Sequence, residues 1–177
     1  MCQSIALSQI PSLDQESAYY QRLFPNASQA GKDRAVQLMF LRLGSMQQLL
    51  GRIRETGRKP QVCLYALTAR NCSPTRSLRE ARAFAEREGL FVRPGQSFTD
   101  LVDLALSDQR PGWATVRQQV EKGYVNGVVA LTPSVIAPDI NAYERELSWF
   151  DTHGGFVGLV HAEVTEPPPQ AVQGATT

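Results

Sequence analysis

After Pro60 the sequence alternates between short apolar runs and longer amphipathic segments, and this alternation constrains the fold more than any other feature. Four apolar runs predict buried strands, at residues 62–67, 90–92, 127–131 and 156–160. Strands separated by helices of about ten to fifteen residues form βαβ units with right-handed crossovers. We therefore expect an α/β domain with a mainly parallel sheet of four to five strands and helices on both faces.

Local signals place the helices between these strands. Ser77 to Glu80 form a capping box that predicts the start of a helix ending at Gly89. Residues 93–109 are expected to form a long polar connection. It leads to a helix that carries Trp113, Val116 and Val120 on one face. Asp139 is expected to cap the last helix, on which Ile140, Tyr143, Leu147 and Phe150 align.

Residues 1–59 are expected to form an N-terminal helical extension, which contains one long helix from about Gln29 to Thr56. The apolar stripe of this helix consists of Val36, Met39, Phe40, Leu43, Met46, Leu50 and Ile53. A stripe of this length must be covered. It either packs on its own sheet domain or forms a homodimer contact through residues 36–53. Because crossover helices already cover both sheet faces, we favour the dimer slightly, with Met39, Leu43, Met46 and Leu50 at its centre. The remaining parts are a domain at 60–164 and a flexible Pro-rich tail at 165–177.

Composition excludes several functional classes. No apolar run is long enough to span a bilayer, and no signal peptide pattern opens the chain, so we expect no membrane association. Three cysteines form neither a CxxC pair nor an even disulfide framework, which favours a reducing, cytoplasmic location and argues against zinc. Nucleotide-binding glycine loops and the GxSxG nucleophile motif are absent from the sequence, and we expect no cofactor.

Charge is distributed unevenly along the chain. Residues 32–93 contain thirteen Lys and Arg against five Asp and Glu, whereas the whole chain has a net charge of only +1. Such a basic segment suits contact with phosphates, and it also suits an ordinary solvated helix face.

Three phrases in the second half of the chain carry a family resemblance: CLYALTA at 63–69, LSDQRPGW at 106–113 and GVVALT at 127–132. In this order they resemble the catalytic domain of the serine recombinases, the resolvase and invertase family. In that family the first strand is usually written Y-A-R-V-S, a mobile loop runs into R-P-G, and a later apolar strand precedes D-R-L-S-R. The resemblance covers about 100 residues. It implies a resolvase-like fold and a relation to site-specific DNA recombination.

The chemistry implied by the resemblance is phosphoryl transfer, in which a serine hydroxyl attacks a DNA phosphodiester and arginines neutralise the phosphate charge. Tyr65, Asp100 and Arg110 match family positions. The nucleophile position is occupied by Ala69, and an arginine position by Leu67. After the third strand the family's Asp-Arg-x-x-Arg falls on Pro133, Ser134 and Ala137. Leu and Ala cannot replace a guanidinium at a phosphate, so we assign no catalytic residue.

The expected function is therefore that of a catalytically inactive, resolvase-like module that associates with DNA or with a protein partner in a recombination or regulatory setting. Arg70 and Arg110 are the candidate DNA-binding residues. The alternative is an active recombinase-type enzyme with shifted residues, in which Thr68 or Ser73 supplies the nucleophile. Convergence of a hydroxyl and two guanidinium groups beyond the first and third strands would favour the active enzyme.

Overall fold

The structure is a computed structural model that describes residues 29–103 and 109–163. The expected tail, residues 1–28 and the segment 104–108 lie outside these ranges. In chain order the elements are α2 (Gln29–Glu55), β1 (Val62–Thr68), α3 (Thr75–Arg87), β2 (Ser97–Leu101), α4 (Pro111–Glu121), β3 (Gly127–Ala130), α5 (Pro133–Ile136), α6 (Ile140–Thr152) and β4 (Phe156–Leu159).

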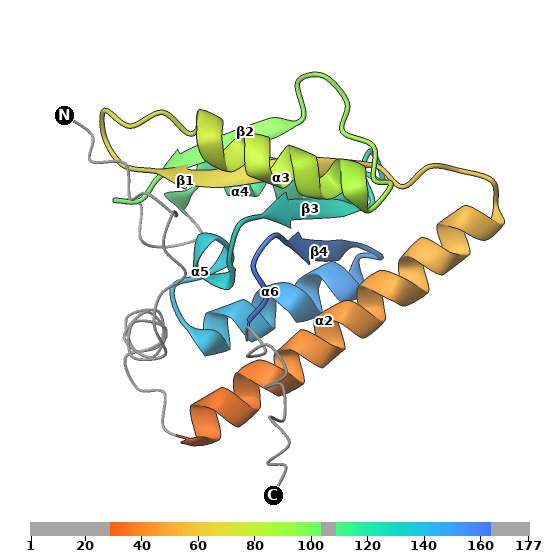
Figure 1. The fold of residues 1–177 in the computed structure, drawn as a ribbon, viewed down its shortest axis with the longest axis horizontal. Helices are drawn as coiled ribbons and strands as arrows, with labels where there is room; N and C mark the ends of the chain where they lie inside the picture. Colours follow the sequence, from red (N-terminus) through yellow and green to blue (C-terminus); the bar gives the residue numbers. More distant parts are fainter. Residues whose placement is uncertain (1–28, 104–108, 164–177) are drawn as a thin grey trace, which may run out of the picture.

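The four described strands form one parallel sheet in the order β2-β1-β3-β4 (Figure 1). Strand β1 lies in the middle, where Leu64 pairs with Ser97 of β2 on one side and with Val129 of β3 on the other. Each crossover contains at least one helix, as a parallel connection requires. The expected α/β class with a mainly parallel sheet is confirmed.

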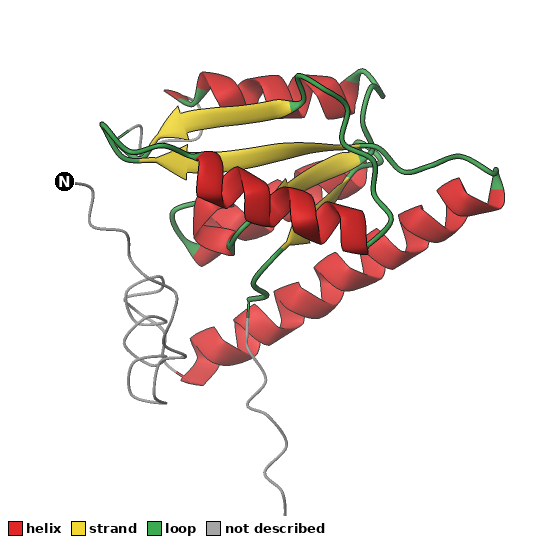
Figure 2. Ribbon diagram, turned by 45° about the horizontal axis from the view of Figure 1, so that its top comes forward, coloured by secondary structure: helices red, strands yellow, loops and turns green. Residues whose placement is uncertain are grey.

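Helices cover both faces of the sheet (Figure 2). Successive residues of β1 pack on opposite sides of it. On one face Cys63 and Tyr65 pack with residues of α4 and α6, among them Trp113, Val116, Tyr143 and Phe150. On the other face Val62 and Leu64 pack with residues of α3 and of the second half of α2. The sheet is therefore the shared wall of two hydrophobic clusters.

The second strand is not where the sequence analysis placed it. Strand β2 lies within the expected polar connection, whereas residues 90–92 contribute only one bridge, between Phe91 and Gln61. Leu90 and Val92 are buried because they pack beside α3 and α2, and not because they belong to a strand. Strand β2 is at the sheet edge, and of its five residues only Asp100 is buried. An edge strand of this kind has no apolar run to detect.

Helix boundaries agree with the expected signals in part. Asp139 caps α6, because its carboxylate accepts hydrogen bonds from the backbone N–H groups of Asn141 and Ala142, each at 2.9 Å. The predicted start of α3 is wrong. The helix begins at Thr75, and its first helical bond runs from Leu78 N to Pro74 O at 3.0 Å, which places Ser77 inside the helix.

Helix α2 packs on its own chain, alongside β4 and α6 (Figure 1). The buried stripe contains Ala35, Leu38, Arg42, Met46 and Leu50 at three- and four-residue spacing. Met46 and Leu50, which we expected at the centre of a dimer contact, are in the hydrophobic cluster beside α3 and cannot also contact a second chain.

The opposite side of α2 is open to solvent. Phe40 and Leu41 are 65% and 62% exposed. A homodimer through the positions of residues 36–53 that are not buried within the chain stays a prediction.

A buried ion pair ties α2 to the end of the sheet domain. The guanidinium of Arg42 binds both carboxylate oxygens of Glu163, with Nε–Oε1 and Nη2–Oε2 distances of 2.6 and 2.8 Å. Tyr143 of α6 donates a third hydrogen bond to the same carboxylate at 2.6 Å. All three side chains are buried. Burial by itself lowers the pKa of Arg42, but the hydrogen bonds that Arg42 donates to Glu163, together with the Glu163 charge, raise this pKa above its ordinary value.

Among the described helices, none combines the length and apolar character that crossing a membrane requires.

Candidate functional site at the carboxyl edge of the sheet

Parallel strands direct their carboxyl ends to one edge, where ligands and catalytic groups gather in open α/β sheets. At this edge β1 ends in Thr68, and the exposed residues Ala69 and Arg70 follow. The guanidinium of Arg70 forms a surface ion pair with Asp103, at an Nε–Oδ2 distance of 2.8 Å. Arg70 is therefore accessible to a ligand at the cost of one exposed ion pair, which is a small cost.

Tyr65 and Asp100 meet inside the domain. The Tyr65 hydroxyl donates to Asp100 Oδ2 at 2.8 Å, and the same carboxylate accepts the backbone N–H groups of Gly112 and Trp113 at 2.9 and 2.8 Å. Asp100 thus supplies from β2 the cap that the first turn of α4 lacks in its own sequence. Burial, the largest influence, raises the pKa of Tyr65 above its ordinary value.

The first turn of α4 lies so close to β2 that position 112 has no room for a side chain. A Cβ atom at this position would lie 2.8 Å from the carbonyl oxygen of Thr99 and 2.9 Å from Asp100 Oδ2. The Arg-Pro-Gly phrase therefore brings the backbone of α4 directly against β2, with Pro111 in the first helical turn.

Arg110 points inward. It is only 3% exposed, its Nη1 donates to Val135 O at 2.9 Å, and its Nη2 donates to Ile136 O. Its guanidinium carbon lies 5.8 Å from the centre of the Tyr65 ring and 5.4 Å from that of Trp113. In this arrangement Arg110 connects α4 to α5. Contact with a DNA phosphate would require these backbone hydrogen bonds to break.

The remaining family positions are apolar or engaged locally. Leu67 is partly buried against the cluster that includes Trp113, and Pro133 and Ala137 are buried in and after α5. Ser134 shares a hydrogen bond of 2.9 Å with the Thr132 hydroxyl.

The two candidate replacement nucleophiles also have local partners. Thr68 Oγ1 donates to Cys72 O at 2.6 Å, and Ser73 Oγ lies 2.5 Å from Thr75 Oγ1. Across residues 29–103 and 109–163, no aliphatic hydroxyl hydrogen-bonds to Arg70 or Arg110. Among the described residues, therefore, no hydroxyl is hydrogen-bonded to a pair of guanidinium groups at this edge.

No group of three or more metal-binding side chains (His, Cys, Asp or Glu) occurs in the described part of the chain. Cys63 is a buried free thiol on β1, whereas Cys72 is disulfide-bonded, a bond that the sequence analysis did not predict.

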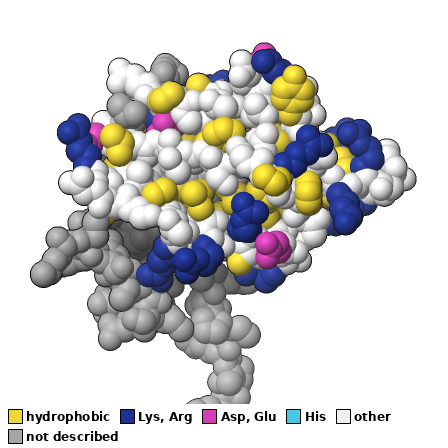
Figure 3. All heavy atoms as spheres, turned by 90° about the horizontal axis from the view of Figure 1, so that it is seen from above, with side chains coloured by type: hydrophobic (Ala, Val, Ile, Leu, Met, Phe, Trp, Pro, Cys, Tyr) yellow, Lys and Arg dark blue, Asp and Glu magenta, His cyan; other side chains and the backbone are white. Residues whose placement is uncertain are grey.

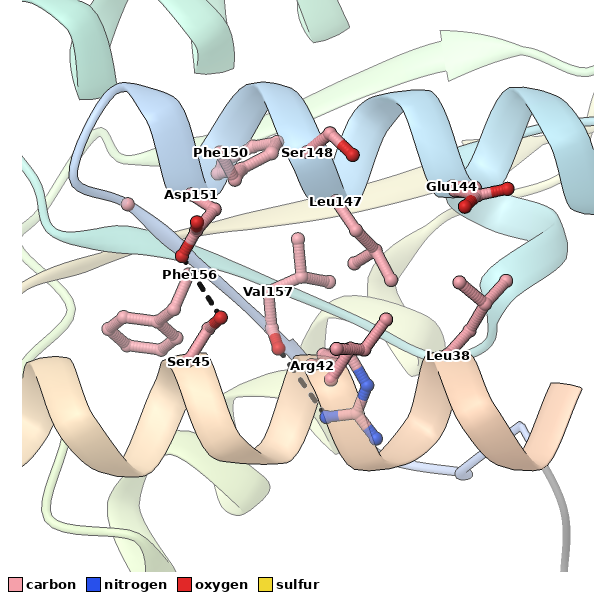
Figure 4. Close-up of a pocket in the computed structure, with 12 residues that line it drawn as sticks. Leu38, Arg42, Ser45, Glu144, Leu147, Ser148, Phe150, Asp151, Phe156 and Val157 are labelled. Carbon is pink, nitrogen blue, oxygen red and sulfur yellow. Dashed lines mark hydrogen bonds between the residues drawn. The ribbon is translucent and has the colours of Figure 1, made fainter. Parts of the chain in front are cut away.

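A hollow of about 160 Å³ lies between α2 and α6, against β4 (Figure 4). Ser45 and Asp151 hydrogen-bond across it at 3.0 Å, and Arg42 reaches Val157 O at 3.4 Å beneath it. Leu38, Leu41 and Leu147 form much of the remaining lining. The charged groups here connect the two helices, and their arrangement does not resemble a catalytic site.

Burial raises the pKa of the Cys63 thiol from 9.0 to about 12. Because the folded state holds this proton more tightly, the associated stability is complete below pH 9 and is lost as the pH rises toward 12. Between pH 9 and pH 10 the unfolded thiol loses most of its proton, and we expect the free energy of unfolding to fall by about 1 kcal/mol over this interval. Urea unfolding of the native chain and of Cys63→Ala measures this. The variant should lack the Cys63 contribution and therefore show a smaller slope, and equal slopes in both proteins would refute the assignment.

No protein-family model and no curated protein sequence matches the chain. Its architecture is similar to the solved C-terminal catalytic domain of ISC1926 TnpA, an IS607-like serine recombinase. The TM-score is 0.51 at 18% identity, over 58% of this chain and 71% of that one. The domain has the serine recombinase catalytic fold. The resemblance read from the three sequence phrases is therefore confirmed at the level of the fold.

Two other solved structures are similar to this serine recombinase fold. The N-terminal catalytic domain of TP901-1 integrase gives a TM-score of 0.49 at 16% identity, over 56% of this chain and 76% of that one. A serine recombinase from Sulfolobus solfataricus gives 0.44 at 18% identity, over 61% and 73%.

Sequence reasoning missed the cluster formed by Arg42, Tyr143 and Glu163. One signal for it exists in the sequence, because Arg42 occupies a position in the buried stripe of α2 between Leu38 and Met46. A charged residue in an apolar stripe needs a buried partner of opposite charge. The identity of that partner, 121 residues away, has no local sequence signal.

Proposed function

We propose that this chain is a serine-recombinase-type domain that does not cleave DNA and that acts as a DNA-associated or protein-interacting module in recombination or its regulation. One observation carries the proposal. At the carboxyl edge Ala69 replaces the expected nucleophile, and Arg110, a retained arginine, is engaged with backbone carbonyls inside the fold.

The fold supports the general setting of DNA recombination, and the chemistry of the edge argues against phosphoryl transfer within it. Stabilising a phosphoryl transition state takes donors aimed at the equatorial oxygens. Tyr65 and Asp100 hydrogen-bond to each other, and Asp100 also accepts two backbone N–H groups at the start of α4. These structural roles are sufficient to explain why both residues are present. The alternative of an active enzyme depends on Thr68 or Ser73, and both hydroxyls are engaged in local bonds.

Incubation of the chain with supercoiled and with nicked DNA, followed by denaturing electrophoresis, tests the proposal. We expect no covalent protein–DNA adduct, because no aliphatic hydroxyl of the described residues is hydrogen-bonded to Arg70 or Arg110. Ala69→Ser, which restores the family nucleophile alone, is also expected to form none, since the guanidinium groups remain absent. An adduct mapped to Thr68 or Ser73 in the native chain would establish the active alternative, and Thr68→Val and Ser73→Ala would then identify the residue.

A further inference from the structure

The loops at the amino edge of the sheet, opposite the candidate site, form a second polar hollow of about 150 Å³. Three separate connections build it: Arg58 follows α2, Arg93 precedes β2, and Tyr124 follows α4. Gln61, Gly123 and Asn126 complete the lining. In Figure 1 all strand arrows point away from this edge, which lies beside the end of α2.

The lining of this hollow favours an anion. Two arginines line it and no carboxylate does. Neither guanidinium forms an ion pair with any residue in the two described ranges. A pair of unengaged guanidinium groups around one hollow suits phosphate, which accepts hydrogen bonds in the planar two-point geometry that arginine offers.

The floor of the hollow is fixed by the sheet. Gln61 N donates to Asn126 Oδ1 at 2.9 Å, and Asn126 N donates to Gln61 O at 2.7 Å. The side-chain oxygen of Asn126 accepts the bond from Gln61 N, so the amide faces the sheet through its oxygen. The N–H donors of the same amide group remain for a ligand. Gln61 Oε1 is buried without a hydrogen-bond partner, and a half-turn of this amide would place N–H donors there instead.

The surroundings indicate which kind of anion fits. The Tyr124 ring is 55% exposed at the rim and is available for stacking. Arg52, Arg54 and Lys59, all exposed, continue the positive charge along the end of α2. Figure 3 shows Lys and Arg side chains gathered toward that end of the molecule, with few Asp or Glu. A phosphate-binding hollow with an open aromatic ring and a basic approach is typical of single-stranded nucleic acid binding.

We propose that this hollow binds a phosphate of single-stranded DNA through Arg58 and Arg93, with an adjacent base stacked on Tyr124. The inference rests on the proposed association with DNA, and it places the DNA contact at the amino edge. It is separate from the absence of cleavage, which the covalent adduct assay tests independently.

Fluorescence anisotropy with a labelled twelve-residue oligothymidylate tests the assignment, with inorganic phosphate as competitor. We expect Arg58→Gln/Arg93→Gln to weaken binding about tenfold or more. Because one phosphate contact is lost, the slope of log affinity against log salt concentration should fall by about 0.7. Tyr124→Ala should weaken binding at least about fivefold without changing that slope. The matched control is Arg79→Gln/Arg82→Gln, which removes two exposed arginines from α3 and leaves the hollow intact.

Circular dichroism establishes that each variant is folded before binding is compared. A hollow-specific loss, competed by phosphate, supports the proposal. Equal losses in the hollow and control variants would show a general charge effect and overturn it, and so would failure of the native chain to bind. A DNA duplex of the same length is measured in the same assay. If Tyr124→Ala binds the oligothymidylate as tightly as the native chain does, and the native chain binds duplex and single strand equally well, the stacking assignment is overturned.

Discussion

Replacing Arg42 by methionine is expected to lower the free energy of unfolding by about 3–5 kcal/mol. Methionine matches the length of the side chain and suits the apolar stripe of α2. It leaves the Glu163 carboxylate buried, with the Tyr143 hydroxyl as its remaining side-chain donor among those described above. At about 2–4 °C per kcal/mol, the midpoint of thermal unfolding should fall by roughly 6–20 °C.

A double-mutant cycle separates the ion pair from packing. Arg42→Met/Glu163→Met removes both charges, so its loss should be clearly smaller than the sum of the two single losses. Arg34→Gln is the control, because Arg34 pairs with Glu144 on the surface, and removing that pair should cost at most about 1 kcal/mol. Additive losses in the cycle would show that Arg42 and Glu163 act independently, contrary to the structure.

Replacing Asp100 by alanine is expected to cost about 3 kcal/mol or more, because three donors lose one acceptor. Two of these donors belong to the first turn of α4, and the third is the Tyr65 hydroxyl. Asp100→Asn keeps the shape and one acceptor oxygen, so a smaller loss is expected. Urea unfolding measures both, and the near-ultraviolet circular dichroism of Trp113 reports whether α4 has shifted.

Asp103→Ala serves as the control for Asp100. Asp103 follows β2 closely in the chain, but its ion pair with Arg70 is exposed, and removing it should change stability by at most about 0.5 kcal/mol. If Asp100→Ala were as stable as the native chain, the carboxylate would not be the cap of α4, and its place at the carboxyl edge would need a functional explanation.

The interior of the domain was readable from the sequence. Strands β1, β3 and β4 are continuous apolar runs because both sheet faces are covered, and their positions agree with expectation to within one residue at each end. The expected helix from Gln29 to about Thr56 and the cap at Asp139 were equally accurate, because both depend on neighbouring residues. The recombinase-type fold followed from the order of these elements and three short phrases.

For the candidate site, the sequence predicted which residues occupy the family positions but not how their side chains are arranged. The sequence places Ala69 where a nucleophile is expected, but it does not reveal that Arg110 turns inward to the carbonyls of α5. Nor does it reveal that Asp100 belongs to an edge strand and caps α4, since that strand has no apolar run and the capped helix starts eleven residues later.

The sequence by itself determined the local elements, because helical and strand periodicity, caps and breakers act over a few residues. Only the tertiary structure decided what covers the stripe of α2, which partner neutralises Arg42, and which loops bring Arg58 and Arg93 to one hollow. These outcomes depend on contacts between residues far apart in the chain. Such contacts are selected by the burial and charge balance of the whole fold, and no local pattern encodes them.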